Sequence, residues 1–265
     1  MRWAIRLFFP VILLPILCGC RTEDMFADDL SMARQAQMER DWPRAERMAE
    51  RFLRTENDAE KRWEAWNLLL QAVNATAQEP RVSLECLDAM LVEYEGDMAK
   101  EAEILAQIGK YSQAISQYAR AANAWNAYVE LPDISMAERI KGYRNLAAAQ
   151  SGLRNFDAAE ESLQQCLALP APDHDKIWCM VDLADAGMGR QRWQDVADIC
   201  EQIQDSDPDD EVLGWACYYR GDALEQLGKP AEALKQFEQA KDKYPNPAVI
   251  DSRIDYLKKQ LKDKK

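Results

Sequence analysis

Histidine is nearly absent from this chain of 265 residues. The single histidine, His174, lies between Asp173 and Asp175 in a proline-rich stretch. One histidine cannot hold zinc by itself, and no pair of cysteines has the spacing of metal ligands. The glycine-rich signatures that bind phosphates or dinucleotides are also missing. We therefore expect no metal, no cofactor and no catalytic residue, and we do not expect an enzyme.

Positive charge is also in short supply. Lysine and arginine number 33 against 46 aspartates and glutamates, which gives a formal net charge of -13. Phosphate backbones are bound by clustered lysine and arginine, so this balance argues against a nucleic-acid partner. It argues equally against a protein that lies flat on anionic lipid. The simplest interpretation of the acidic surface is that it keeps the protein soluble.

The sequence lacks an apolar run of the length that spans a membrane. The run from Leu7 to Leu17 covers about 11 residues and contains Pro10 and Pro15, whereas a spanning helix needs roughly 20 apolar residues. Arg2 and Arg6 supply positive charge before this run, and small residues follow it. This order is typical of a secretory signal peptide.

The apolar run ends in Leu17-Cys18-Gly19-Cys20, which resembles the lipobox of bacterial lipoproteins. The resemblance implies a signal peptide at residues 1–19, acylation of Cys20 and a short tether at residues 20–26. Acyl chains of the usual number would give near-permanent anchoring. Arg21 rather than aspartate follows the lipidated residue, which by analogy with bacterial sorting implies the outer membrane, facing the periplasm. The alternative is that Cys20 is an ordinary thiol beside a cleaved signal.

Five more cysteines follow in the exported part of the chain, where oxidation is allowed. They form no Cys-x-x-Cys pair, and each lies on the apolar face of an expected helix. We favour free buried thiols that act as small apolar residues, and the alternative is one or two bridges between neighbouring helices. These residues are Cys86, Cys166, Cys179, Cys200 and Cys217.

Glycine is scarce, at 10 residues, and helix-forming residues dominate the composition. Prolines fall between segments of helical periodicity, where a proline begins or ends a helix at little cost. Composition and proline spacing together predict an all-α protein. The prolines in question are Pro80, Pro132, Pro170, Pro172, Pro208, Pro230, Pro245 and Pro247.

A repeat of 37 residues is visible in the second half of the chain. Residues 177–213 align with residues 214–250 when the sequence is shifted by this distance. A period in this range indicates a solenoid of stacked units. The aligned pairs include Trp178 with Trp215, Asp185 with Asp222, and Pro208 with Pro245.

The clearest unit runs over residues 216–245. Gly221 lies in its first helix, Gly228 closes that helix, and Ala233 and Phe237 share one face of the second helix. This pattern resembles the tetratricopeptide repeat, a helix–turn–helix unit of about 34 residues. Small residues are needed where the two helices cross closely, and the aromatic ring fills the space beside the crossing.

Five further units carry the same pattern less completely. The small residue of the second helix is expected at Ala45, Ser83, Ala114, Ala159, Val196 and Ala233. The irregular spacing around Ala114 leads us to expect that residues 123–131 extend one second helix by two turns. The resemblance implies an α-solenoid of about six tetratricopeptide-like helix pairs over residues 27–247, closed by a capping helix at residues 248–265.

In tetratricopeptide arrays the first helices of successive units line a concave groove, and the resemblance places eight residues along it. Tryptophans flanked by carboxylates would suit an extended or helical peptide with apolar and basic residues. The alternative is that both tryptophans pack between helices as spacers. Only Arg144 and Asn145 resemble the set that binds a free C-terminal carboxylate in some relatives, so we do not expect that ligand. The groove residues are Lys141, Arg144, Trp178, Val181, Asp185, Trp215, Tyr218 and Asp222.

These features predict an adaptor that recruits a protein partner to the outer membrane. A lipobox followed directly by repeats resembles bacterial lipoproteins that assist outer-membrane barrel assembly, assemble pili or deliver substrates to periplasmic proteases. A second hypothesis is an envelope protein that holds peptidoglycan or another glycan in the same groove, because tryptophans stack on sugar rings.

Overall fold

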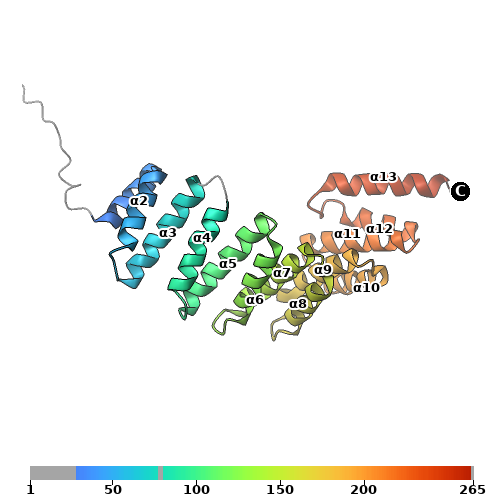
Figure 1. The fold of residues 1–265 in the computed structure, drawn as a ribbon. Coiled ribbons are helices and arrows are strands. Elements are labelled where there is room, and N and C mark those ends of the chain that lie inside the picture. Colours follow the sequence, from blue (N-terminus) through green and yellow to red (C-terminus); the bar gives the residue numbers. More distant parts are fainter. Residues whose placement is uncertain (1–27, 77–79, 264–265) are drawn as a thin grey trace, which may run out of the picture. The chain divides into compact units, whose positions relative to one another are not determined.

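The computed structural model describes residues 28–76 and 80–263, which form thirteen α-helices and contain no β-strand (Figure 1). The prediction of an all-α solenoid is therefore confirmed. None of the helices in these two ranges is long and apolar enough to cross a membrane. The expected signal peptide at residues 1–19, the lipidation candidate Cys20 and the tether at 20–26 lie outside the described residues.

The contacts among the helices divide the chain into two compact units, which meet in sequence after residue 76. The first unit holds α1 (Asp29–Glu39), α2 (Trp42–Leu53) and α3 (Ala59–Thr76). The described helices of the second unit are α4 (Pro80–Glu93), α5 (Met98–Ala114), α6 (Tyr118–Glu130), α7 (Met136–Gly152), α8 (Phe156–Ala168), α9 (Asp173–Gly189), α10 (Trp193–Asp205), α11 (Asp210–Gln226), α12 (Pro230–Ala240) and α13 (Pro247–Asp263).

Small side chains let the three helices of the first unit approach one another. Ala36, Ala45 and Ala72 come one from each helix and are fully buried, with Trp42 packed against them. Alanine is well suited to such crossings because it fills little space and favours the helical conformation. The expected small residue at Ala45 is therefore confirmed.

One turn geometry recurs between the two helices of a pair in the second unit. Arg154, Gln191 and Gly228 each adopt a left-handed φ, of 60°, 58° and 75°. The next residue then donates its N–H to a carbonyl five residues earlier, as from Lys229 to Leu224 at 2.9 Å. This arrangement satisfies the last carbonyls of the first helix. The left-handed residues at 154, 191 and 228 are 37 positions apart, so the turn carries the period of the sequence.

Close helix crossings explain the small residues of the repeat. A Cβ at Gly221 of α11 would lie 2.8 Å from the ring of Phe237 on α12, which is too close for any side chain. In the preceding pair, Val196 of α10 is larger than the expected alanine. It fits because Gly187 of α9 faces it, where a Cβ would lie 2.8 Å from a Val196 methyl carbon.

The small residue expected at Ala114 does not lie in a second helix, so this prediction was wrong. Ala114 is exposed and ends α5, whereas the buried small residue of the second helix of that pair is Ala121 in α6. The segment at residues 108–110 resembles the turn at residues 227–229, but α5 continues through it. Gly109 is a crossing residue, pressed against the ring of Trp125, and the turn comes at Ser116.

The expected extension of a second helix at residues 123–131 was wrong for the same reason. Helix α6 begins at Tyr118 and ends at Glu130, with 13 residues. Helix α8 in the next pair has the same length of 13 residues. The second helices of these two pairs are therefore equal in length. The irregular spacing of the expected small residues arose because Ala114 was chosen in place of Ala121.

Helix α13 covers the last pair. Its residues Ile250, Ile254 and Leu257 are buried and share one core with Phe237 of α12 and Leu224 of α11. Burying large aliphatic side chains in this way contributes about 1.5–3 kcal/mol each. The C-terminal capping helix expected from the sequence is present and begins at Pro247.

Candidate functional site

Three hollows open between the first helices of successive pairs in the second unit. They lie between α5 and α7, between α7 and α9, and between α9 and α11, with volumes of about 540, 460 and 450 Å³. Lys141 lines both of the first two, and Arg144 and Asp182 line both of the last two. Because neighbouring hollows share residues, they form one continuous groove along the first helices.

The groove contains six of the eight residues that the sequence places there. Two of the expected residues, Tyr218 and Asp222, line none of the three hollows. Val181 is only 3% exposed and therefore forms part of the floor. The six that line the groove are Lys141, Arg144, Trp178, Val181, Asp185 and Trp215.

An ion pair forms the wall between the second and third hollows. The Arg144 guanidinium on α7 donates two hydrogen bonds to the Asp182 carboxylate on α9, at 2.5 and 3.3 Å. The same guanidinium lies over the ring of Trp178, 5.1 Å from its centroid. A planar cation that meets a carboxylate at its edge and an indole at its face is held in one orientation.

The Asp182 carboxylate is stripped of much of its water. Burial raises its pKa above the ordinary value, and the nearby charge of Asp185 acts in the same direction, against the opposing effect of Arg144. Desolvation disfavours the charged form of a carboxyl group. Even with Arg144 as its partner, the ionised Asp182 carboxylate is therefore less stable here than it is in water.

Aromatic side chains connect α11 to the groove. Trp215 stacks on Tyr219 with ring centroids 5.6 Å apart, and its other contacts include the edge of Tyr244 at 4.8 Å. Tyr219 lies close to the Asp185 carboxylate of α9, and burial together with that carboxylate raises the pKa of Tyr219. Aromatic pairs in such arrangements stabilise beyond their buried area. Both groove tryptophans thus combine a packing role with partial exposure.

Tyr218 and Asp222 belong to the attachment of the capping helix. Asp222 forms an ion pair with Arg253 of α13, which also reaches Glu225 at 3.0 Å. Tyr218 stacks on Tyr244 at 4.5 Å. Burial, with a contribution from Asp222, raises the pKa of Tyr218 to about 12. For these two residues the geometry indicates a structural role.

Sequence reasoning missed Asp182, Tyr219 and Glu211, all of which line the third hollow. The 37-residue shift places Asn145 on Asp182 and Asp182 on Tyr219. This column therefore faces the groove in three successive pairs, although its residues differ in type. The tryptophans and aspartates were selected because the same residue recurs at equivalent positions of successive units. Asn145, Asp182 and Tyr219 occupy equivalent positions but differ in type, so the repeat gave no indication of their role.

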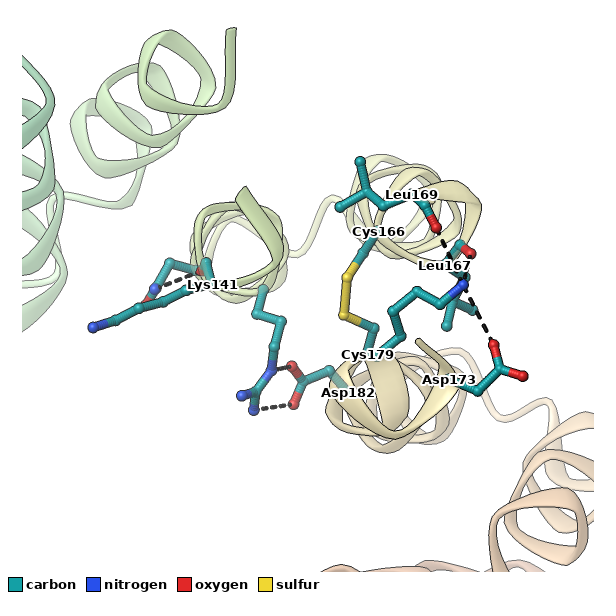
Figure 2. The surroundings of a disulfide bond; sticks show 10 residues. Lys141, Cys166, Leu167, Leu169, Asp173, Cys179 and Asp182 are labelled. Atoms are coloured by element: carbon teal, nitrogen blue, oxygen red, sulfur yellow. Dashed lines mark hydrogen bonds and ion pairs between the residues drawn. A yellow bond between two sulfur atoms is a disulfide. The ribbon is translucent and has the colours of Figure 1, made fainter. Parts of the chain in front are cut away.

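A disulfide bond joins α8 to α9 beside the groove. Figure 2 shows the bridge between Cys166 and Cys179, with Asp182 on the same helix as Cys179 and on the side that faces Lys141. Lys176 reinforces this junction, because its ammonium donates to the carbonyls of Leu167 and Leu169 at 3.0 and 3.2 Å. The bridge fixes the helix that carries Trp178 and Asp182.

The other three cysteines of the described residues are free. Cys200 and Cys217 are buried and Cys86 is half-buried. Burial raises the pKa of Cys86 and of Cys200 to about 12, and that of Cys217 to about 11. Thiols with a high pKa are inert and pack as small apolar residues. The expectation of free thiols is therefore correct for Cys86, Cys200 and Cys217. The alternative of a bridge between neighbouring helices is correct for Cys166 and Cys179.

The described side chains offer no clustered metal ligands, since no group of three or more histidine, cysteine, aspartate or glutamate residues in residues 28–76 and 80–263 is placed to hold an ion. What the groove does offer is aromatic surface, carboxylates and backbone on rigid helices. Such a surface suits recognition of another chain.

Comparison with protein families finds the repeat directly in the last pair. Residues 214–247 match the family model described as "Tetratricopeptide repeat". The matched segment holds α11 and α12 and the turn between them. A search of curated proteins found no match to this chain.

Solved structures resemble a larger part of the chain. The apo form of RapI is 10% identical, with a TM-score of 0.63 over 89% of this chain and 71% of that one. A putative kinesin light chain with nearly identical TPR-like repeats from Podospora anserina is 18% identical, with a TM-score of 0.49 over 66% of this chain and 92% of that one. The P58(IPK) TPR domain is 14% identical, with a TM-score of 0.43 over 89% and 66%. The likeness to RapI shows the fold and nothing beyond it.

Proposed function

We propose that this chain is an outer-membrane lipoprotein whose repeat array faces the periplasm and recruits a protein partner through its groove. The observation that carries the proposal is the continuous groove along α5, α7, α9 and α11, with three hollows that share lining residues. Repeat solenoids present such extended surfaces to other chains. The lipobox at residues 17–20 supports the membrane attachment.

The charge of the part of the second unit that carries the groove favours a basic segment of the partner. Residues 80–228 contain 27 acidic and 12 basic residues. Opposite charge on the partner speeds encounter and suppresses wrong partners. The occupant we propose is an extended or helical peptide with apolar and basic side chains, in a pathway of envelope assembly.

A glycan in the groove is not favoured by the geometry. Arg144 covers the ring of Trp178, and Tyr219 and Tyr244 pack against the ring of Trp215. Stacking on a sugar needs an indole face that is free. We therefore do not propose a peptidoglycan-binding role.

Matched variants test the groove. Ala148 is exposed and lines the second hollow, while Gln239 is exposed on α12 and lines none of the three. Ala148→Trp should fill the hollow and abolish recovery of specific proteins with the detergent-solubilised chain, whereas Gln239→Trp should leave recovery unchanged. Equal recovery by both variants, with helical content intact by circular dichroism, would place the partner site elsewhere.

Lipid attachment has its own matched pair. Cys20→Ser should abolish labelling by radioactive palmitate in growing cells, because the acylated side chain is removed. Cys18→Ser should retain the label, since this residue is lost with the signal peptide. Labelling that survives in Cys20→Ser would contradict the proposed anchor.

A further inference from the structure

The third hollow, between α9 and α11, combines aromatic faces with carboxylates. Trp178, Trp215 and Tyr219 supply the aromatic surface, and Asp182 and Glu211 supply the negative charge. Aromatic rings attract cations over their faces, and carboxylates bind a guanidinium through two parallel hydrogen bonds. The chemistry of the hollow therefore suits a planar cation.

A guanidinium already sits at the edge of this hollow. Arg144 makes both contacts that such a ligand requires, the two hydrogen bonds to Asp182 and the position over Trp178 at 5.1 Å. Its side chain is 33% exposed and that of Asp182 is 30% exposed, so both groups can be reached from solvent. The molecule itself thus shows which group the site accepts.

The negative charge around the hollow exceeds what Arg144 offsets. Asp185 lies near enough to Asp182 to raise its pKa further, beyond the effect of burial. Glu211 is exposed and forms no ion pair with any described residue. A second cation in this region would find carboxylates that are not yet compensated.

The groove offers Arg144 a second carboxylate as a partner. It lines the second hollow as well as the third, and the second hollow contains Asp185. A rotation of its side chain would move the guanidinium from one carboxylate toward the other. Displacement by a competing cation would therefore not leave Arg144 in an apolar environment.

We propose that the hollow between α9 and α11 is a subsite for an arginine side chain of the partner peptide, which displaces Arg144 from Asp182 and Trp178. This inference rests on the proposed function, because the arginine belongs to a peptide held in the groove. Arg144 acts as an internal occupant that weakens binding until a matching side chain replaces it.

The test uses the full-length chain in detergent micelles and two fluorescent seven-residue peptides. Both have apolar residues around a central position, which is arginine in one and citrulline, its neutral isostere, in the other. Affinity is measured by fluorescence anisotropy for the natural chain, Arg144→Gln, Glu211→Gln and Asp182→Asn. Arg154→Gln is the matched control, because it removes one positive charge from an exposed turn residue that lines none of the three hollows.

Arg144→Gln should bind the arginine peptide about tenfold more tightly than the natural chain does, because the internal competitor is gone. Arg154→Gln should stay within about twofold. Asp182→Asn and Glu211→Gln should each weaken arginine binding and leave citrulline binding unchanged. Glu211 is exposed, so its variant reports on the site even where Asp182→Asn disturbs folding.

Equal affinity of Arg144→Gln for the two peptides overturns the subsite, as does a gain of equal size in Arg154→Gln. Absence of measurable arginine binding by Arg144→Gln overturns it as well. None of these outcomes touches the proposed function, which is tested separately by the recovery of proteins with the Ala148→Trp chain. The two ideas can therefore be rejected separately.

Discussion

Helices α9 and α11 carry the same residues at equivalent positions and use them differently. Trp178 and Asp185 on α9 correspond to Trp215 and Asp222 on α11. On α9 both line the groove, and the Asp185 carboxylate lies close to Tyr219 of the following first helix. On α11 the aspartate binds Arg253 of the capping helix. A residue that recurs in the sequence does not necessarily recur in its role.

The two helices are also held in place by different means. Cys179 ties α9 to α8 through the disulfide, and the residue at the equivalent position of α11 is Ala216. In place of a covalent bond, α11 is covered by α13 through Ile250, Ile254 and Leu257. The terminal pair uses Asp222 to attach the cap, and the inner pair keeps the equivalent Asp185 in the groove.

The largest expected effect comes from the aromatic ring at the last crossing. Phe237→Ala should lower the free energy of unfolding by roughly 3–5 kcal/mol, because Phe237 is fully buried against Gly221 and the cap core. Cys200 is the equivalent residue of α10, and Cys200→Ala should cost about 1 kcal/mol because a single sulfur is removed. Urea denaturation followed by circular dichroism measures both, and equal losses would show that the two crossings are packed alike.

Reduction of the disulfide tests the other means of attachment. The bridge spans 13 positions, so its loss should lower the free energy of unfolding by about 2–4 kcal/mol. The measurement is urea denaturation with and without a phosphine reductant. Cys166→Ala should become insensitive to the reductant, and Cys86→Ala should respond as the natural chain does. A natural chain whose midpoint ignores the reductant would contradict this prediction.

The two equivalent aspartates should differ in their effect on stability. Asp222→Asn weakens the ion pair with a half-buried arginine of the cap and should cost about 1–3 kcal/mol. Asp185 is exposed, so Asp185→Asn should cost less than about 1 kcal/mol. Thermal unfolding of both variants checks the order, and a larger loss for Asp185→Asn would reverse our assignment of roles.

A smaller effect is expected at alkaline pH. The pKa of Tyr218 is raised from 10.0 to about 12, chiefly by burial, so the folded state favours the neutral phenol. As the pH rises above 10, ionisation therefore favours the unfolded chain, and this contribution to stability is lost as the pH approaches 12. Tyr218→Phe should lose less stability than the natural chain between pH 10 and pH 12. Parallel curves in urea denaturation would show that Tyr218 is not coupled to folding.

The sequence predicted the fold well where the repeat was locally consistent. In the last pair, Gly221, Gly228 and Phe237 each have one structural use, and all three were placed correctly. The small residue of the pair formed by α5 and α6 was misplaced because a glycine at a helix crossing, such as Gly109, and a glycine at a turn, such as Gly228, look alike in the sequence. The difference lies in Trp125, which packs against Gly109 from another helix.

The groove was predictable only in part. Repetition pointed to Trp178 and Trp215, but it also selected Asp222, whose partner Arg253 lies in a helix outside the repeat. Asp182 went unnoticed because its counterparts are Asn145 and Tyr219. Which carboxylate meets Arg144 depends on how far neighbouring helices are rotated, and the period does not determine that rotation.

Crosslinking in living cells tests the central claim most directly. A photoreactive residue at Ala148 would lie in the groove without replacing a buried side chain, and one at Gln239 would lie on α12 outside the groove. The account predicts that Ala148 yields one recurrent crosslinked protein, identified by mass spectrometry, and that Gln239 does not yield it. The same protein crosslinked from Gln239 and not from Ala148 would show that the groove is not the partner site.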